Sequence, residues 1–257
     1  MRTAAAIAGL VVTVALARVA AAEPPPLDHV VTAPTAWLPQ AGTVVTWAGL
    51  DHRADTSADL GYGLGGIAAV DIGADHDLRL CDGCDPTSAT NPTNPTTIAL
   101  VRAGFRVGVR QDAWFAGQPA VVLGTRATFA GTRGARASDL YLVASRRFGG
   151  LRVHVGVDAM DARSTDHAGE PSLGATVRPT VGLELTVAQY PRTTLMGDLT
   201  WVPLADPGMP RVESIGGFGV RYQSVRWAGV ELVVRARGGE GLGDATVVAR
   251  VYGVFGQ

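Results

Sequence analysis

The chain has 257 residues, 47% of them hydrophobic, and a formal net charge of −1 with an isoelectric point near 6.5. This length fits a single all-β domain, so a second domain is not required. Binding to nucleic acid depends on a basic surface that neutralises phosphates, so we expect no nucleic-acid partner. The 33 glycines follow no collagen-like triplet and, with abundant Val and Leu, indicate a β-rich protein.

Residues 1–22 have the features of a secretory signal peptide. Arg2 gives a positive start, and Ala4–Ala17 is an uncharged run that is shorter than the ~20 residues a spanning helix needs. Ala20–Ala22 supply small residues for a signal peptidase, so we expect the mature chain to begin at Glu23. The alternative is an uncleaved amphipathic helix, although the run has no polar face.

The segment that follows is expected to be extended, over residues 23–42, and the barrel domain described below is expected to cover residues 43–257. Val44, Val45 and Trp47 indicate a first strand over Thr43–Asp51. Arg, Asp or Gly interrupts every later apolar stretch, so the mature chain is either soluble or crosses a membrane as strands.

Alternation with a period of two residues is clearest over Val101–Arg110. Its odd-numbered residues are Val, Ala or Phe, and its even-numbered residues are Arg or Gly. This is the pattern of a β-strand with one apolar face. Leu151–Ala159 repeats it, and Leu173–Val187 extends it over about fifteen residues. Globular strands are usually about five or six residues long, whereas a tilted membrane-crossing strand needs about 9 to 11.

Further segments with this alternation bring the number of strands from Leu60 onward to ten: Leu60–Ala74, Ala120–Gly131, Asp139–Phe148, Thr193–Val202, Val212–Gln223, Gly229–Arg237 and Asp244–Phe255. Thr43–Asp51 and an ill-defined strand before it would make twelve. The polar faces are rich in Gly and Arg, which suits a narrow barrel interior better than the surface of a soluble sandwich. We therefore predict an all-β fold, a closed antiparallel up-and-down transmembrane β-barrel of about 12 strands, with 10 as the alternative.

The connections between these strands alternate in length. Gly149–Gly150 and Ala188–Arg192 are short, whereas Asp161–Ser172 and Asp75–Thr97 are long. Outer-membrane barrels have short periplasmic turns and longer external loops. This alternation predicts a periplasmic C-terminus and places Asp75–Thr97 outside the cell.

The last strand resembles the final strand of Gram-negative outer-membrane β-barrel proteins. Its residues alternate between two faces, Val247, Ala249, Val251, Gly253 and Phe255 on one and Val248, Arg250, Tyr252 and Val254 on the other, and Gly256 and Gln257 follow. The resemblance implies a location in the bacterial outer membrane, with the lipid bilayer and the barrel-assembly machinery as partners. Thr32–Thr43 is similar to the opening of some poorly characterised outer-membrane proteins, which implies a fold and a location but no site residues.

The alternation also predicts which charged side chains face the interior of the barrel, the lumen. They are Arg102, Arg106, Arg110, Arg126, Arg152, His154, Asp158, Arg178, Glu184, Asp198, Arg221, Glu231, Arg235 and Arg250. This set has a slight cationic excess and, in an open lumen, predicts a weak preference for anions. The alternative is a closed barrel whose interior charges pair with one another.

Cys81 and Cys84 form a Cys-x-x-Cys motif within a loop rich in Gly, Pro and Asn. A local disulfide in an oxidising compartment is the interpretation that fits this setting best. Zinc binding would need about four ligands, and thioredoxin-like chemistry would need the motif at the start of a helix. We predict no metal or cofactor.

A hydrolytic site is the alternative to a channel. His154 and Asp158 share a strand face but lie about 13 Å apart along it, too far for a hydrogen bond. A triad would need a partner from a neighbouring strand, such as Ser145, and no nucleophile motif is present. We expect a passive, porin-like channel or a structural membrane protein, with two alternatives: a barrel enzyme acting on lipid or peptide, and a soluble secreted ligand-binding barrel.

Overall fold

The structure is a computed structural model, and it describes residues 27–52, 56–75, 79–80, 100–129, 136–163, 174–205, 211–238 and 245–256. The expected signal peptide, residues 1–22, lies outside these ranges, as do Cys81 and Cys84. The signal peptide and the disulfide therefore stay predictions. None of the described residues belongs to a helix long and apolar enough to cross a membrane.

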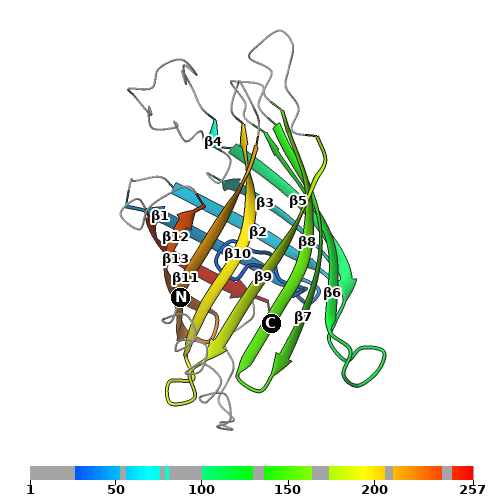
Figure 1. The fold of residues 1–257 in the computed structure, drawn as a ribbon. Helices are drawn as coiled ribbons and strands as arrows, with labels where there is room; N and C mark the ends of the chain where they lie inside the picture. The colour runs from blue at the N-terminus through cyan, green and yellow to red at the C-terminus, as the bar shows by residue number, and fades with distance from the viewer. Residues whose placement is uncertain are drawn as a thin grey trace, which may run out of the picture.

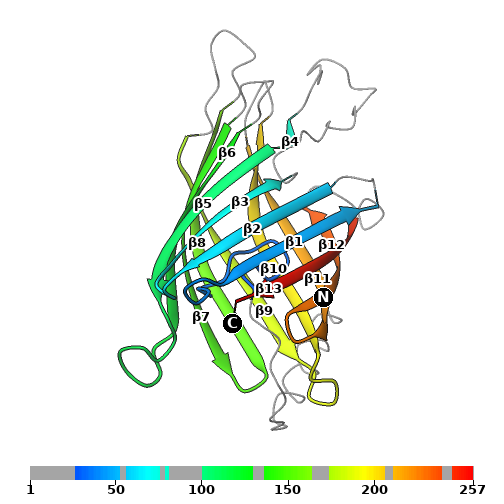
Figure 2. The same cartoon turned by 180° about the vertical axis from the view of Figure 1, so that it is seen from behind.

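Twelve antiparallel strands form a closed barrel with up-and-down topology (Figures 1 and 2). They are β1 Val44–Asp51, β2 Thr56–Leu64, β3 Ala68–Asp75, β5 Leu100–Val109, β6 Ala120–Phe129, β7 Arg136–Phe148, β8 Leu151–Arg163, β9 Thr176–Thr186, β10 Thr193–Ala205, β11 Arg211–Val225, β12 Ala228–Arg237 and β13 Thr246–Phe255. The two-residue strand β4, Arg79–Leu80, lies parallel to the end of β10. The barrel closes where β1 pairs with β13, in a register that sets Val44 opposite Phe255.

The predicted closed barrel of 12 strands is confirmed, and the alternative of 10 is wrong. The sequence pattern indicated one long strand over Leu60–Ala74. The structure has two strands there, β2 and β3, which brings the number of strands to twelve. Gly65 and Gly66 adopt φ angles of +80° and +71°, which residues other than glycine rarely adopt, and they turn the chain between β2 and β3. The expected strand before Thr43 is not part of the wall.

The apolar faces of the strands point away from the barrel axis. Phe105 is 46% exposed, whereas its neighbour Arg106 is 2% exposed. The same holds around the barrel, where exposed side chains include Leu60, Ile72, Leu123, Leu142, Val157, Leu183, Leu199, Phe218, Leu232 and Val251. A monomeric soluble protein rarely exposes so large a continuous apolar surface, and outer-membrane barrels have such a band in contact with lipid.

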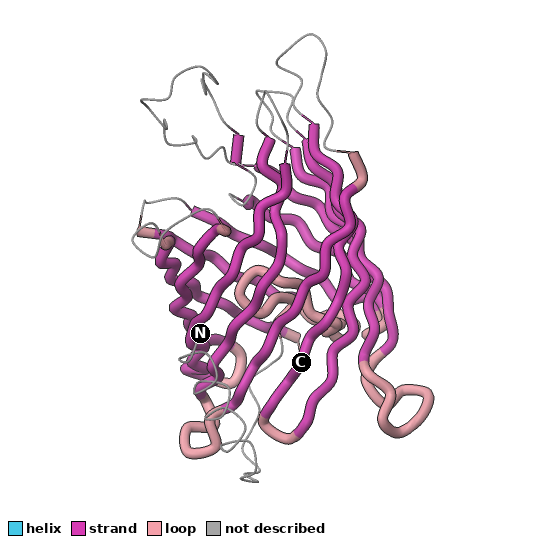
Figure 3. The backbone as a smooth tube through the Cα atoms, viewed as in Figure 1, coloured by secondary structure: helices cyan, strands magenta, loops and turns pink. Residues whose placement is uncertain are grey.

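Residues 27–42 lie inside the barrel, and we call this segment the plug (Figure 3). It folds back on itself, because a β-bridge joins His29 to Pro34 and the Thr35 N–H donates to the Asp28 carbonyl at 2.9 Å. The side chains of Leu27, Val30 and Leu38 are buried against the wall. Over residues 27–42, the segment that was expected to be extended is therefore folded within the interior.

Replacement of Val157 by Arg tests whether lipid covers the outer face. Val157 lies outward in the middle of β8. If hydrocarbon surrounds it, Val157→Arg should lower the free energy of unfolding by about 2–4 kcal/mol, as Arg does near the bilayer midplane. Urea unfolding of the protein refolded in lipid vesicles measures this change. Phe115→Arg is the control, since Phe115 is exposed in the turn between β5 and β6, and should change stability little. An equally small effect of both substitutions would contradict a lipid-facing position for Val157.

Candidate functional site

One carboxylate on the wall binds the turn at Val30–Ala33, which we call the tip of the plug. The backbone N–H groups of Val31, Thr32 and Ala33 donate to Oδ2 of Asp198, on β10, at 2.9, 2.6 and 2.6 Å. Hydrogen bonds to a charged group contribute about 1.5–3 kcal/mol each, more than bonds between neutral partners. Asp198, predicted as a lumenal charge, therefore anchors the N-terminal segment.

Two arginines donate hydrogen bonds to carbonyl groups of the same stretch of backbone. Arg221, on β11, donates from Nη2 to the carbonyls of His29 and Val30 at 3.2 and 3.4 Å. Arg250, on β13, donates from Nη1 to the carbonyl of Val31 at 2.7 Å. Each arginine also has a carboxylate partner on the wall, so both are satisfied apart from the plug.

Glycines on the wall make room for the two valines of the tip. A Cβ atom at Gly182, on β9, would lie 2.6 Å from Cγ2 of Val30, and one at Gly217, on β11, would lie 2.6 Å from Cγ1 of Val31. No real Cβ atom approaches another carbon so closely. A side chain at either position would therefore force the plug to move.

The plug also contacts the opposite side of the barrel. Asp28 lies 3.4 Å from Nη1 of Arg106 on β5, and the Ala36 N–H donates to Oγ of Ser145 on β7 at 2.8 Å. Leu38 packs in a cluster with residues of β3, β6 and β7. Because its tip reaches β9–β13 and its flanks reach β5–β7, the plug crosses the lumen.

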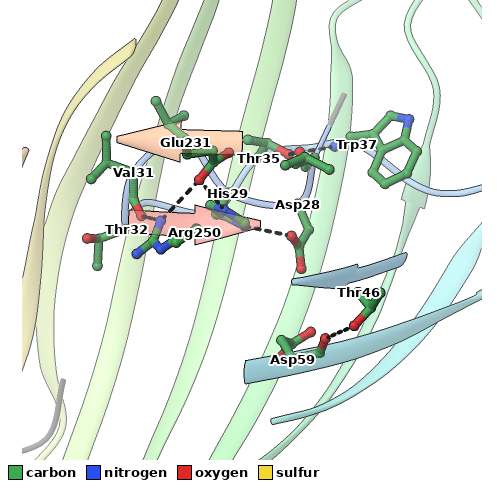
Figure 4. Close-up of polar contacts among 12 residues, drawn as sticks. Asp28, His29, Val31, Thr32, Thr35, Trp37, Thr46, Asp59, Glu231 and Arg250 are labelled. Carbon is green, nitrogen blue, oxygen red and sulfur yellow. Dashed lines mark hydrogen bonds and ion pairs between the residues drawn. The ribbon is translucent and has the colours of Figure 1, made fainter. Parts of the chain in front are cut away.

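His29 links two acidic groups at the centre of this crossing. Its Nδ1 lies 2.8 Å from Asp28, and its Nε2 lies 3.6 Å from Glu231 (Figure 4). Burial lowers the pKa of His29, but the contacts with Asp28 and Glu231 outweigh burial and raise the pKa above its ordinary value. Burial raises the pKa of Asp28, but Arg106 and His29 outweigh it and hold the pKa well below its usual range.

A cavity of about 120 Å³ lies between the plug and the barrel end that carries the long connections. Plug residues Asp28, His29 and Thr32 form part of its lining, together with Arg106 and Tyr141 of the wall. A solute that entered from this end would meet the plug at the bottom of the cavity.

The side chains predicted to carry the lumenal charges differ in how deeply the structure buries them. Seven are buried inside the barrel: Arg106, His154, Asp158, Glu184, Arg221, Glu231 and Arg250. Partly buried are Arg102, Arg126, Arg152, Asp198 and Arg235. Arg110 and Arg178 are exposed near strand ends, where the Arg178 guanidinium lies over the Trp201 ring at 5.3 Å from its centroid. The structure thus places these two arginines away from the enclosed interior.

Acidic partners that the sequence pattern does not reveal cancel the predicted excess of arginine. Arg102 contacts Asp59 at 2.6 Å, and Arg126 contacts Asp139 at 2.9 Å. Asp28 comes from the plug, which the pattern predicts only as an extended segment before the barrel domain. Among the described interior residues the charges are therefore close to balanced, and the basis for a preference for anions is lost.

Ser145, His154 and Glu184 lie together, as a hydrolytic triad would. The Ser145 Oγ is 2.7 Å from Nδ1 of His154, and Nε2 of His154 is 3.6 Å from Glu184. However, Ser145 also accepts the Ala36 N–H, and all three side chains are buried beneath the plug. This cluster fixes the plug, and it is not part of the lining of the cavity. Asp158 belongs elsewhere, 3.8 Å from Arg126.

The described residues include no group of three or more His, Cys, Asp or Glu side chains arranged to hold a metal ion.

Comparison with solved structures identifies barrels of the same fold. A KdgM porin has a TM-score of 0.52 and 7% sequence identity, with 83% of this chain and 99% of that chain covered. The KdgM porin in complex with disordered oligogalacturonate has a TM-score of 0.50 and 7% identity, covering 84% and 99%. A NanC porin has a TM-score of 0.51 and 9% identity, covering 83% and 99%. The chain therefore has the fold of outer-membrane β-barrel proteins. No family model matches the sequence, and no curated protein matches it.

Replacement of Gly217 by Ala tests the packing of Val31 against the wall at Gly217. The new methyl group would overlap Val31, so the plug should lose its docked position and the free energy of unfolding should fall by about 1–3 kcal/mol. Proteolysis of the detergent-solubilised protein, followed by mass spectrometry, should show new cleavage within residues 27–42. Gly197→Ala on β10 is the matched control, because its Cβ would make only an ordinary contact at 3.5 Å. Equal protection of the plug in both variants would contradict this packing.

Proposed function

We propose that the protein is a porin-like channel of a bacterial outer membrane, through which small hydrophilic solutes pass, and that the plug narrows its path. The observation that carries this proposal is the distribution of side chains on the wall, with apolar groups outside and charged groups inside. A barrel with this distribution separates a polar interior from hydrocarbon. The KdgM and NanC barrels of the same fold are porins, which supports the assignment.

The paired interior charges favour weak ion selectivity. Arg102, Arg126 and Arg152 each have a carboxylate partner within 2.9 Å, so none of them presents an uncompensated charge to a passing ion. We infer that solutes are discriminated mainly by size. In this proposal the long connections face the outside of the cell. The short turns, the start of β1 and the end of β13 face the periplasm, as in other outer-membrane barrels.

The two alternative functions have less support. A hydrolase needs a nucleophile that substrate can reach, and Ser145 is 7% exposed and holds the plug. A soluble ligand-binding barrel would have to keep Phe105, Leu142 and Val157 in water, together with the rest of the apolar band.

Planar-bilayer recording tests the channel. The refolded mature chain should give small conductance steps, and a salt gradient should give a reversal potential near zero because the interior charges balance. Asp59→Asn should move the selectivity toward anions, since it removes one negative charge from the interior, 2.6 Å from Arg102. Ser224→Asn, an exposed polar position near the turn after β11, is the control and should leave the reversal potential unchanged. Absence of steps from the wild type and from a variant without the plug would contradict a channel.

We also propose that β13, which ends at Phe255, is recognised by the barrel-assembly machinery. Phe255 is exposed, pairs with Val44 at the closing seam and lies 5.3 Å from the ring of Trp227. Phe255→Ala should lower the amount of folded barrel in the outer-membrane fraction of cells. Phe218→Ala removes an outward aromatic from β11 and serves as the control. An equal loss in both variants would point to lost aromatic contact with lipid rather than to a terminal signal.

A further inference from the structure

The wall of β9–β13 contains a binding site for a peptide backbone. We propose that the plug occupies this site reversibly, and that solute passes only when the plug has left it. The proposal rests on the channel function above and adds the element that controls it.

The site recognises main-chain atoms. Asp198 accepts three consecutive N–H groups, from Val31 to Ala33, and Arg221 and Arg250 donate to three consecutive carbonyls, from His29 to Val31. Such contacts recognise a backbone turn, because consecutive N–H groups point to one side only in a turn, and the chain turns at Val30–Ala33. The hollows at Gly182 and Gly217 add selectivity, because they accept two neighbouring branched side chains.

Departure of the plug leaves Arg221 and Arg250 with their carboxylate partners on the wall, whereas Arg106 loses its contact with Asp28. Arg221 remains within 2.7 Å of both Glu184 and Glu231, and Arg250 remains 3.5 Å from Glu231. Asp198 loses its three donors, and water in a hydrated lumen can replace them. The plug has no ladder with the wall strands among the described residues, since its one bridge, His29–Pro34, is internal. The barrel therefore needs no plug to keep its strand pairing.

The cavity supplies the route by which the plug is reached. It lies on the side of the plug that faces the end with the long connections, and Asp28, His29 and Thr32 form part of its lining. Among the described residues, the plug lies between this cavity and the contacts of Ser145 and Glu184 beneath it. Movement of residues 27–42 would thus remove the barrier that crosses the lumen.

A reversible cross-link tests the proposal. In a Cys81→Ser, Cys84→Ser background, Val30→Cys and Gly182→Cys would place two thiols suitably, because a Cβ at Gly182 would lie 3.4 Å from that of Val30. Disulfides have Cβ atoms about 3.5–4.5 Å apart. Oxidation should abolish the conductance steps, and reduction should restore them. The two single-cysteine variants are the matched controls and should conduct equally under both conditions.

A second experiment supplies the peptide separately. A variant without residues 27–40 should give larger and longer steps than the wild type, and a synthetic peptide of residues 27–40 should suppress them. The same peptide with Lys at the positions of Val30 and Val31 should not, because Lys does not fit the hollows at Gly182 and Gly217.

The outcomes separate this proposal from the channel function. Conductance that oxidation of the cross-link leaves unchanged would overturn the gate and leave the channel standing. The gate would also be overturned if the wild type never conducted while the deletion variant did, because the plug would then be permanent. Silence of every form, the deletion variant included, would overturn the channel itself. If the deletion variant does not fold, the cross-link still decides the question.

Discussion

The structure depends on the separation of apolar from charged side chains across a wall one strand thick. Because the apolar side chains face outward, the charged ones must face the other side, where they crowd into a narrow space. Arg221 illustrates the result: it is 2% exposed and contacts both Glu184 and Glu231. A buried charge is tolerable only when it is paired and hydrogen-bonded, so the buried arginines Arg106, Arg221 and Arg250 each lie near an acidic residue. The plug is held by the same groups.

The sequence predicts the wall well, because its signal is local. Alternation over Val101–Arg110 needs only neighbouring residues to be interpreted, and the sides it assigns to Phe105 and Arg106 are those found in the structure. The turn at Gly65 and Gly66 was not predicted, because apolar alternation continues across it. Side-chain pattern alone does not show where glycine reverses the chain.

The interior could not be predicted to the same extent. The hydrogen bonds between the backbone of the plug and side chains of the wall span 109 or more positions, as between Ala36 and Ser145. Backbone groups are the same in every residue and leave no trace in the sequence pattern. The pairing of Arg102 with Asp59 depends on which strands become neighbours across a long connection. For these reasons the charged residues that the pattern assigns to the lumen contain more Arg than Asp and Glu. Acidic residues that lie near them in the structure balance this excess.

The position of the plug before β1 constrains the order of assembly. Its anchors, Asp198, Arg221 and Arg250, lie in the last third of the chain, and the Arg250 contact to Val31 spans 219 residues. Either the wall closes around a segment already in place, or the segment threads into a finished cylinder. Long-range contacts are slow to form, so the contacts with the last strands are expected late in folding. The segment can reach them through the seam between β1 and β13 before it pairs, or through the barrel end at which β1 begins.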